Sequence, residues 1–166
     1  MSTVTVRKAT PEDRKAIFGV EERAFGRKHE ADLVERIVVD GEQLLELVAE
    51  KDGSIVGHVL FSRLLVDPDG TAFDAVSLAP LAVDPDYQGH GVGSALVRRG
   101  HEILQERGEK LSIVVGDPAY YGRFGYARAG AENFTSDYQG DAMQALYWGE
   151  APTSGQLAHP RAFAGW

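Results

Sequence analysis

Cysteine is absent from this chain of 166 residues. Without a thiol the protein can form no disulfide, no thiolate metal site and no covalent cysteine intermediate, a composition that fits the cytoplasm. Long apolar runs are missing too, since no stretch approaches the roughly 18 consecutive apolar residues of a membrane span. The N-terminal stretch MSTVTVRKAT lacks the apolar core of a secretory signal. We therefore expect a cytoplasmic protein without a membrane segment.

Positive charge is also scarce. Lysine and arginine number 17 against 25 acidic residues, which gives a net charge of −8, and the densest basic cluster is Arg98-Arg99. Because nucleic-acid binders carry a basic footprint, this balance argues against such a partner. The five histidines show no HExxH or HxH spacing, so no metal site is expected. A negative surface mildly favours a cationic partner by attraction.

The periodicity of apolar residues predicts one mixed α/β domain over 1–149. Strands are expected at 4–9, 44–51, 54–66, 73–83, 111–115, 126–129 and 141–148. Helices are expected at 11–25, from about 30 to 39, at 92–107 and briefly after Asp117-Pro118. Three successive strands form an antiparallel meander, so the order is not a regular βαβ winding. Residues 150–166, rich in Ala, Gly and Pro, are expected to be an extended tail packed on the same domain.

Pro80 interrupts the strand predicted at 73–83. Proline cannot donate a ladder hydrogen bond, so a central strand should bulge or splay at this point. If the strand separates there from 111–115, the main chain of residues 81–83 is left without a strand partner. Such groups must find other partners.

The stretch QGHGVGS at 88–94 raises three alternatives for a phosphate-binding loop. A P-loop needs GxxxxGK[ST], and no lysine follows these glycines before Lys110. The dinucleotide fold needs G-x-G-x-x-G directly after a strand, whereas this loop reads G-x-G-x-G and five residues separate it from Val83. The third alternative is a helix N-terminus that binds the pyrophosphate of another cofactor through exposed amides.

Gln88 to Gly93 matches the pattern Q/R-x-x-G-x-G/A and resembles the pyrophosphate loop of the GCN5-related N-acetyltransferase (GNAT) family. LAPLAVDPDYQGHGVGSALVRRG resembles the central motif of that family, and GDPAYYGRFGY resembles its C-terminal signature, particularly in the YhbS-like group of bacterial acetyltransferases. The order of elements fits the family from Val4 to Trp148. The resemblance implies a mostly antiparallel, twisted sheet of six to seven strands, splayed between two central strands, with about four helices.

The resemblance also implies acetyl-coenzyme A as cosubstrate and direct transfer of its acetyl group to a primary amine in a ternary complex. Its pantetheine arm would lie along the splayed strand, with the Val83 amide stabilising the oxyanion, and no metal is implied. Tyr121 stands at the position of the general acid, and Tyr120 beside it would point elsewhere. The residues implied for cofactor binding are Leu81, Ala82, Val83, Gln88, Gly89, His90, Gly91, Val92, Gly93, Ser94 and Tyr121.

The sequence does not identify the general base. Histone-type relatives carry a glutamate on the third meander strand, where this sequence has Ser77. Glu22 and Glu30, near the helix pair that walls the acceptor pocket in this fold, are substitutes. A water relay or a neutral amine substrate would need no dedicated base.

Two other functions fit the same residues. A non-catalytic acyl-coenzyme A-binding module would keep the glycine loop but tolerate Tyr121→Phe, and an NAD(P)-dependent oxidoreductase would bind a dinucleotide instead. The acceptor, a small molecule or a peptide amine, has no recognisable code in the sequence. A homodimer is common in this fold, but no residue pattern specifies one.

Overall fold

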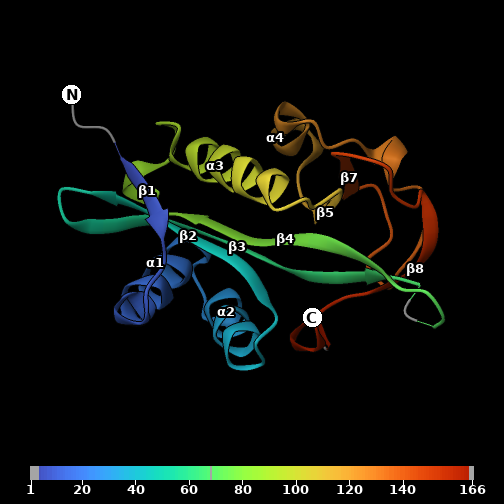
Figure 1. Ribbon diagram of the computed structural model, residues 1–166. Helices are drawn as coiled ribbons and strands as arrows, with labels where there is room; N and C mark the ends of the chain where they lie inside the picture. Colours follow the sequence, from blue (N-terminus) through green and yellow to red (C-terminus); the bar gives the residue numbers. More distant parts are fainter. Residues whose placement is uncertain (1–3, 68, 165–166) are drawn as a thin grey trace.

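The structure is a computed structural model that describes residues 4–67 and 69–164. A twisted sheet lies between two layers of helices (Figure 1). The helices α1 (Arg14–Phe25) and α2 (His29–Val39) cover one face, and α3 (Val92–Glu106) covers the other, followed by the short α4 (Pro118–Tyr121). The predicted mixed α/β class is confirmed.

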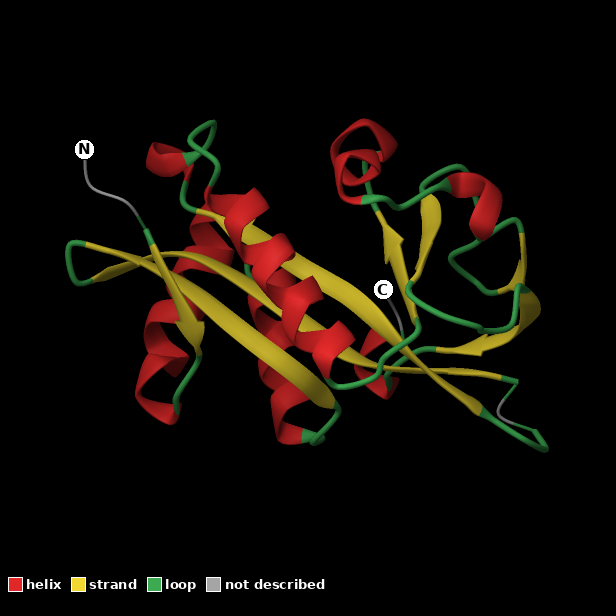
Figure 2. Ribbon diagram, turned by 45° about the horizontal axis from the view of Figure 1, so that its top comes forward, coloured by secondary structure: helices red, strands yellow, loops and turns green. Residues whose placement is uncertain are grey.

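The main path of the sheet runs β1-β2-β3-β4-β5-β7. Only β4 and β5 pair in parallel along this path. The short β8 pairs with the end of β3 and, in parallel, with β6, at the end of the sheet remote from β1 (Figure 2). The strands are β1 (Thr5–Lys8), β2 (Gln43–Lys51), β3 (Ser54–Val66), β4 (Phe73–Val83), β5 (Leu111–Val115), β6 (Asn133–Thr135), β7 (Met143–Tyr147) and β8 (Ser154–Ala158).

The C-terminal third departs most from the sequence-based expectation. Residues 126–129 form only a single bridge between Ala127 and Ala145, followed by a 3₁₀ turn over Arg128–Gly130. Residues 150–164 are not simply an extended tail, because β8 lies within them and buries Leu157, and residues 165–166 of the predicted tail lie outside the described residues. These strands are so short and so poor in alternating residues that period-two patterning does not reveal them.

A capping interaction precedes α1 at the 3₁₀ turn Pro11–Asp13. The carboxylate of Asp13 accepts the backbone N–H of Thr10 at 2.7 Å and also binds the guanidinium of Arg7. The helix ends at Gly26, whose φ of 70° is left-handed, a conformation that glycine adopts without a Cβ penalty. Between these ends, α1 packs against β3 and β4.

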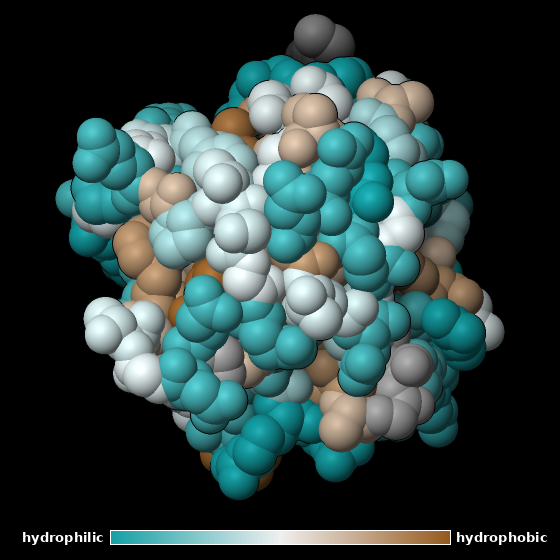
Figure 3. All heavy atoms as spheres, turned by 90° about the vertical axis from the view of Figure 1, so that its right-hand side faces the viewer, coloured by the Kyte–Doolittle hydropathy of each residue, from teal (hydrophilic) through white to brown (hydrophobic). Residues whose placement is uncertain are grey.

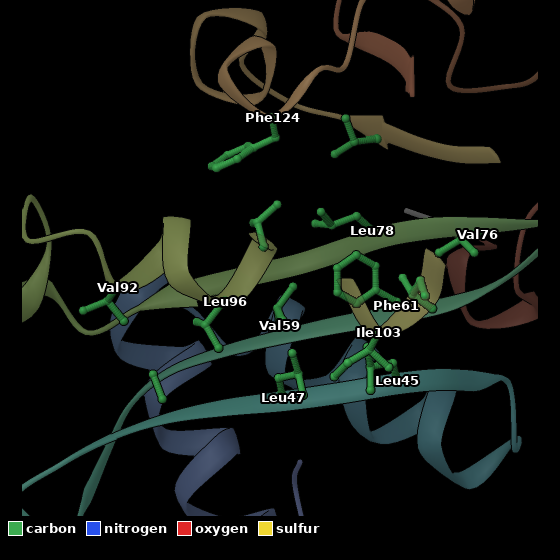
Figure 4. Close-up of a cluster of buried hydrophobic side chains, with 14 of the residues drawn as sticks. Leu45, Leu47, Val59, Phe61, Val76, Leu78, Val92, Leu96, Ile103 and Phe124 are labelled. Carbon is green, nitrogen blue, oxygen red and sulfur yellow. The ribbon is translucent and has the colours of Figure 1, made fainter. Parts of the chain in front are cut away.

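The largest hydrophobic cluster fills the space between α3 and the sheet. Phe61 of β3 lies near Leu78 and Val76 of β4 and Ile103 of α3, all drawn in Figure 4. The close approach depends on Gly100, because a Cβ there would lie 2.3 Å from the Phe61 ring. This contact holds the helix whose N-terminus carries the glycine loop.

Gly100→Ala is therefore expected to destabilise the protein. On helix propensity alone alanine would stabilise by about 1 kcal/mol, but the clash with Phe61 requires repacking at a cost of about 1–3 kcal/mol. Urea unfolding would measure the difference. Gly122→Ala is the matched control, because a Cβ at Gly122 meets nothing within 4 Å and its φ is −57°. Equal stability of both variants would contradict the packing argument.

The end of the molecule that carries β8 and the β3–β4 turn presents mainly hydrophilic residues, with apolar ones in separate patches (Figure 3). Obligate partners bury broad apolar surfaces. The described residues of this face form no broad apolar surface. This face therefore gives no support for a homodimer interface.

Candidate functional site: a gap between two parallel strands

The parallel pairing of β4 and β5 stops halfway along β4. Its last partners are Leu78 and Val114, while β3 stays paired with β4 as far as Val83. The break falls at Pro80, where the β3–β4 register also shifts. The predicted separation of 81–83 from 111–115 is therefore confirmed.

The hydrogen-bonding pattern decides which groups face this gap. The N–H of Asp84 donates to the Val56 carbonyl of β3 at 2.8 Å. Because main-chain groups alternate in direction along a strand, Ala82 also bonds to β3, whereas Leu81 and Val83 turn their polar groups to the gap. The side-chain amide of Gln88 donates to the Val83 carbonyl at 3.0 Å. The Val83 N–H is thus directed at the gap, as the sequence predicted, and the backbone of Ala82 is not.

The glycine loop next to the gap ends at the N-terminus of α3. Gly89 and Gly91 have φ values of 78° and 82°, and Gly91 is the N-cap of the helix. The first helical hydrogen bond runs from the Ala95 N–H to the Gly91 carbonyl. The amides of the first turn therefore point outward with the positive end of the helix dipole, an arrangement that binds phosphate.

A cavity of about 420 Å³ joins the gap to the loop. Of the predicted binding residues, His90, Ala82 and Tyr121 are not among those that line it, and His90 is exposed. Three lining residues were not predicted: Tyr87, Tyr120 and Arg123. The complete lining is Leu81, Val83, Tyr87, Gln88, Gly89, Gly91, Val92, Gly93, Ser94, Tyr120 and Arg123.

Arg123 is the charged residue in this lining. Its guanidinium carbon lies 4.5 Å from the centre of the Tyr120 ring, a cation–π contact that fixes the side chain at the cavity wall. In a protein of net charge −8, this cation makes the cavity locally favourable for phosphate. The motif GDPAYYGRFGY contained the signal, but the loop alone did not reveal it.

Tyr120 lies against the glycine loop, which corrects the expectation that it points elsewhere. A Cβ on Gly93 would lie 2.4 Å from the Tyr120 hydroxyl, so only glycine leaves room for this contact. Burial raises the pKa of Tyr120. Its phenol therefore stays neutral and can act as a hydrogen-bond donor beside the helix N-terminus.

Tyr121 lies behind the cavity, over Gly116 at the end of β5. A Cβ on Gly116 would lie 2.5 Å from the Tyr121 ring, and the ring packs edge-on against Tyr120 and Tyr126 at 5.1 and 5.9 Å between centroids. Burial, and then the nearby Tyr120 and Glu21, raise the pKa of Tyr121 well above its usual value. Its hydroxyl therefore keeps its proton at neutral pH.

The acids predicted near the acceptor pocket differ in their surroundings. Glu22 is half-buried on α1, and Glu30 is 4% exposed on α2. Arg27 donates to both carboxylate oxygens of Glu30, at 2.9 and 2.6 Å. Burial alone would raise the pKa of Glu30, but these bonds from Arg27 lower it overall. Ser77, at the family position of the base, is buried and pairs with Ile113.

Within residues 4–67 and 69–164, no cluster of His, Asp or Glu is arranged to hold a metal ion. None of the helices in that part of the chain combines the length and apolar composition needed to span a bilayer.

Comparison with known proteins identifies a family model and two similar curated proteins. A family model described as "Acetyltransferase (GNAT) domain" matches residues 5–129. The chain is 40% identical over 129 residues to the Escherichia coli protein YjhQ, covering 76% of this chain and 71% of that one. It is 38% identical over 125 residues to E. coli YhbS, covering 75% and 74%. Both relatives are named uncharacterized N-acetyltransferases.

Two solved structures are similar over almost the whole chain. E. coli YhbS in complex with CoA gives a TM-score of 0.89 at 32% identity, covering 98% of this chain and 93% of that one. A GNAT family acetyltransferase from Brucella melitensis in complex with acetyl-CoA gives a TM-score of 0.82 at 31% identity. The match covers 97% of this chain and 98% of that one.

Proposed function

Because the chain belongs to the GNAT family and is an acyltransferase, we propose that it transfers the acetyl group of acetyl-coenzyme A directly to a primary amine. The observation that carries the proposal is the gap beyond Leu78, bordered by the N–H of Val83 and continuous with the glycine loop. An extended arm fits the free strand edge, and a pyrophosphate fits the helix N-terminus. The complexes of the two solved relatives with CoA and acetyl-CoA support this choice.

The phosphate end would be held by the amides of Val92, Gly93 and Ser94, with Arg123 as counter-charge. Gly91 keeps the helix N-terminus open through its left-handed φ. The arm would bond to the main chain of Leu81 and Val83, and the Val83 N–H would stabilise the oxyanion that forms at the thioester carbonyl. A donor of this kind contributes about 2.7–4 kcal/mol to transition-state stabilisation.

Tyr121 would donate its proton to the departing sulfur. Its raised pKa keeps the hydroxyl protonated, and the contact of its ring with Gly116, just after β5, supports this role. The absence of cysteine favours attack by the amine on the bound thioester over an acyl-enzyme. Glu22 and Glu30 as bases, the cytoplasmic location and a homodimer stay predictions.

The test is a set of amines assayed for thiol release from acetyl-coenzyme A. We expect at least one primary amine to accelerate release, with a new amide detected by mass spectrometry. Calorimetric titrations with coenzyme A and with NADH would run in parallel, because tight binding of NADH alone would favour an oxidoreductase. Binding of coenzyme A with no turnover of any amine would contradict the transferase assignment.

A further inference from the structure

A buried network of charged side chains links α1 to β3 and β2 on one face of the sheet. Nδ1 of His58 lies 2.6 Å from Oε2 of Glu21, and Nε2 of the same imidazole lies 2.7 Å from Oε2 of Glu46. Arg14 donates to the second oxygen of Glu46. His58 and Glu21 are both 0% exposed. The network therefore lies in the interior between α1, β2 and β3.

One carboxylate oxygen in this network has no hydrogen-bond partner. Oε1 of Glu21 is buried and, among the described residues, accepts no hydrogen bond. A buried carboxylate oxygen without a donor costs about 1–3 kcal/mol or more, and native proteins rarely keep such a group without a use for it. The three other carboxylate oxygens of the network all take part in hydrogen bonds.

The position of Glu21 relates this free oxygen to the gap. His58 pairs directly with Ala82, and paired residues of antiparallel strands project their side chains from the same face, about 5 Å apart. Since Glu21 bonds to His58, its carboxylate lies beside the part of β4 that leaves β5. The charge of Glu21 also contributes to the raised pKa of Tyr121. Figure 1 shows α1, which carries Glu21, and α4, which carries Tyr121, on opposite faces of the sheet.

We propose that Glu21 is the proton acceptor for the amine in acetyl transfer and that the acceptor is an alkylamine, protonated in neutral solution. The proposal rests on the proposed function. Oε1 of Glu21 would take one proton from the alkylammonium group, which frees the nitrogen lone pair to form its bond to the thioester carbon. The C–S bond breaks with its electron pair left on sulfur, which takes the Tyr121 proton. The second proton of the nitrogen passes to the Tyr121 oxygen, so that an amide, a free thiol and a protonated Glu21 result.

Glu21 suits this step better than the two acids predicted from sequence. Both oxygens of Glu30 are occupied by Arg27, and the helix directs Glu22 about 100° away from Glu21. His58 holds the carboxylate of Glu21 in place, and Glu46 with Arg14 holds His58. These three are positioning residues.

The electrostatics of this network make Glu21 a stronger proton acceptor than an exposed glutamate. Burial raises the pKa of Glu21, against the hydrogen bond from His58. Burial alone would lower the pKa of His58, but its bonds to Glu21 and Glu46 raise it overall. The groups that influence Glu21 are His58 on β3, Glu46 on β2 and Glu30 on α2, with Tyr121 facing it from α4. Activity should therefore fall as the pH drops and Glu21 takes up a proton.

Glu21→Gln tests the proposal with 1,4-diaminobutane, 2-phenylethylamine and glycinamide as acceptors. We expect kcat/KM at neutral pH to fall about 10²-fold, the ascending limb of its pH profile to disappear, and acetyl-coenzyme A affinity to stay unchanged. Nuclear magnetic resonance of the His58 imidazole should show a lowered pKa, because one of its two carboxylates is lost. Glu35→Gln, the same change at an exposed position of α2, is the control.

Normal turnover with the limb intact in Glu21→Gln would overturn the proposal alone. Loss of the limb in Glu22→Gln or Glu30→Gln instead would reassign the base and overturn it too. Turnover of no amine by the wild type, with acetyl-coenzyme A still bound, would overturn the proposed function as well. If Glu21→Gln does not fold, the wild-type profile decides together with those of Glu22→Gln and Glu30→Gln. An ascending limb at the pKa of the free amine means that no base acts and overturns the proposal. A limb well below that pKa that persists in both variants supports Glu21.

Discussion

Replacing Gly91 by glutamate is expected to weaken acetyl-coenzyme A binding by about 10²–10³-fold. The new carboxylate would lie at the N-cap of α3, where the phosphates are expected. Two unit charges about 5 Å apart at an effective dielectric constant of about 20 repel by about 3 kcal/mol, equivalent to about 10²-fold in affinity. The left-handed φ of 82° adds strain for any residue with a Cβ.

The charge and the strain can be separated. Gly91→Gln has nearly the same size and the same backbone penalty without the charge, so it should bind more weakly than the wild type but more tightly than Gly91→Glu. The difference between the two variants should shrink at high salt, because ions screen exposed charges. Isothermal titration calorimetry measures both. Equal affinities for Glu and Gln would mean that the phosphates bind elsewhere.

Tyr121→Phe is expected to lower kcat by about 10³-fold, within the range for loss of a general acid. The ring would still pack against Tyr120, Tyr126 and Gly116, so folding and acetyl-coenzyme A affinity should stay near wild type. Thiol release in single-turnover experiments measures the chemical step. The thiolate of coenzyme A is itself a fair leaving group, so a residual rate is expected without the acid.

Tyr120→Phe provides the contrast. Its hydroxyl lies against the glycine loop, so its loss should raise the dissociation constant of acetyl-coenzyme A more than it lowers kcat. If both variants instead changed affinity alone, Tyr121 would not be the acid. If Tyr121→Phe had a normal kcat, proton donation would have to come from water.

The sequence by itself determined the local features of this protein. Alternation and turn residues set the β2–β3–β4 meander, Asp52-Gly53 made a hairpin turn with positive φ at both residues, and Pro80 marked where β4 leaves β5. The glycines at 89, 91 and 93 indicated the loop, since their conformation and clearance are local requirements. The aromatic signature at 116–126 completed the family resemblance.

Only the tertiary structure decided which side chains meet. The sequence did not point to Glu21, because it does not reveal which helical position packs against His58, 37 residues away in the chain. Strand alternation turned Ala82 toward β3 and Val83 toward the gap once the register was fixed. Arg123 and Tyr120 reached the loop because α4 folds back over the N-terminus of α3. Burial and pairing depend on contacts between distant segments, and a single sequence encodes these only through the completed fold.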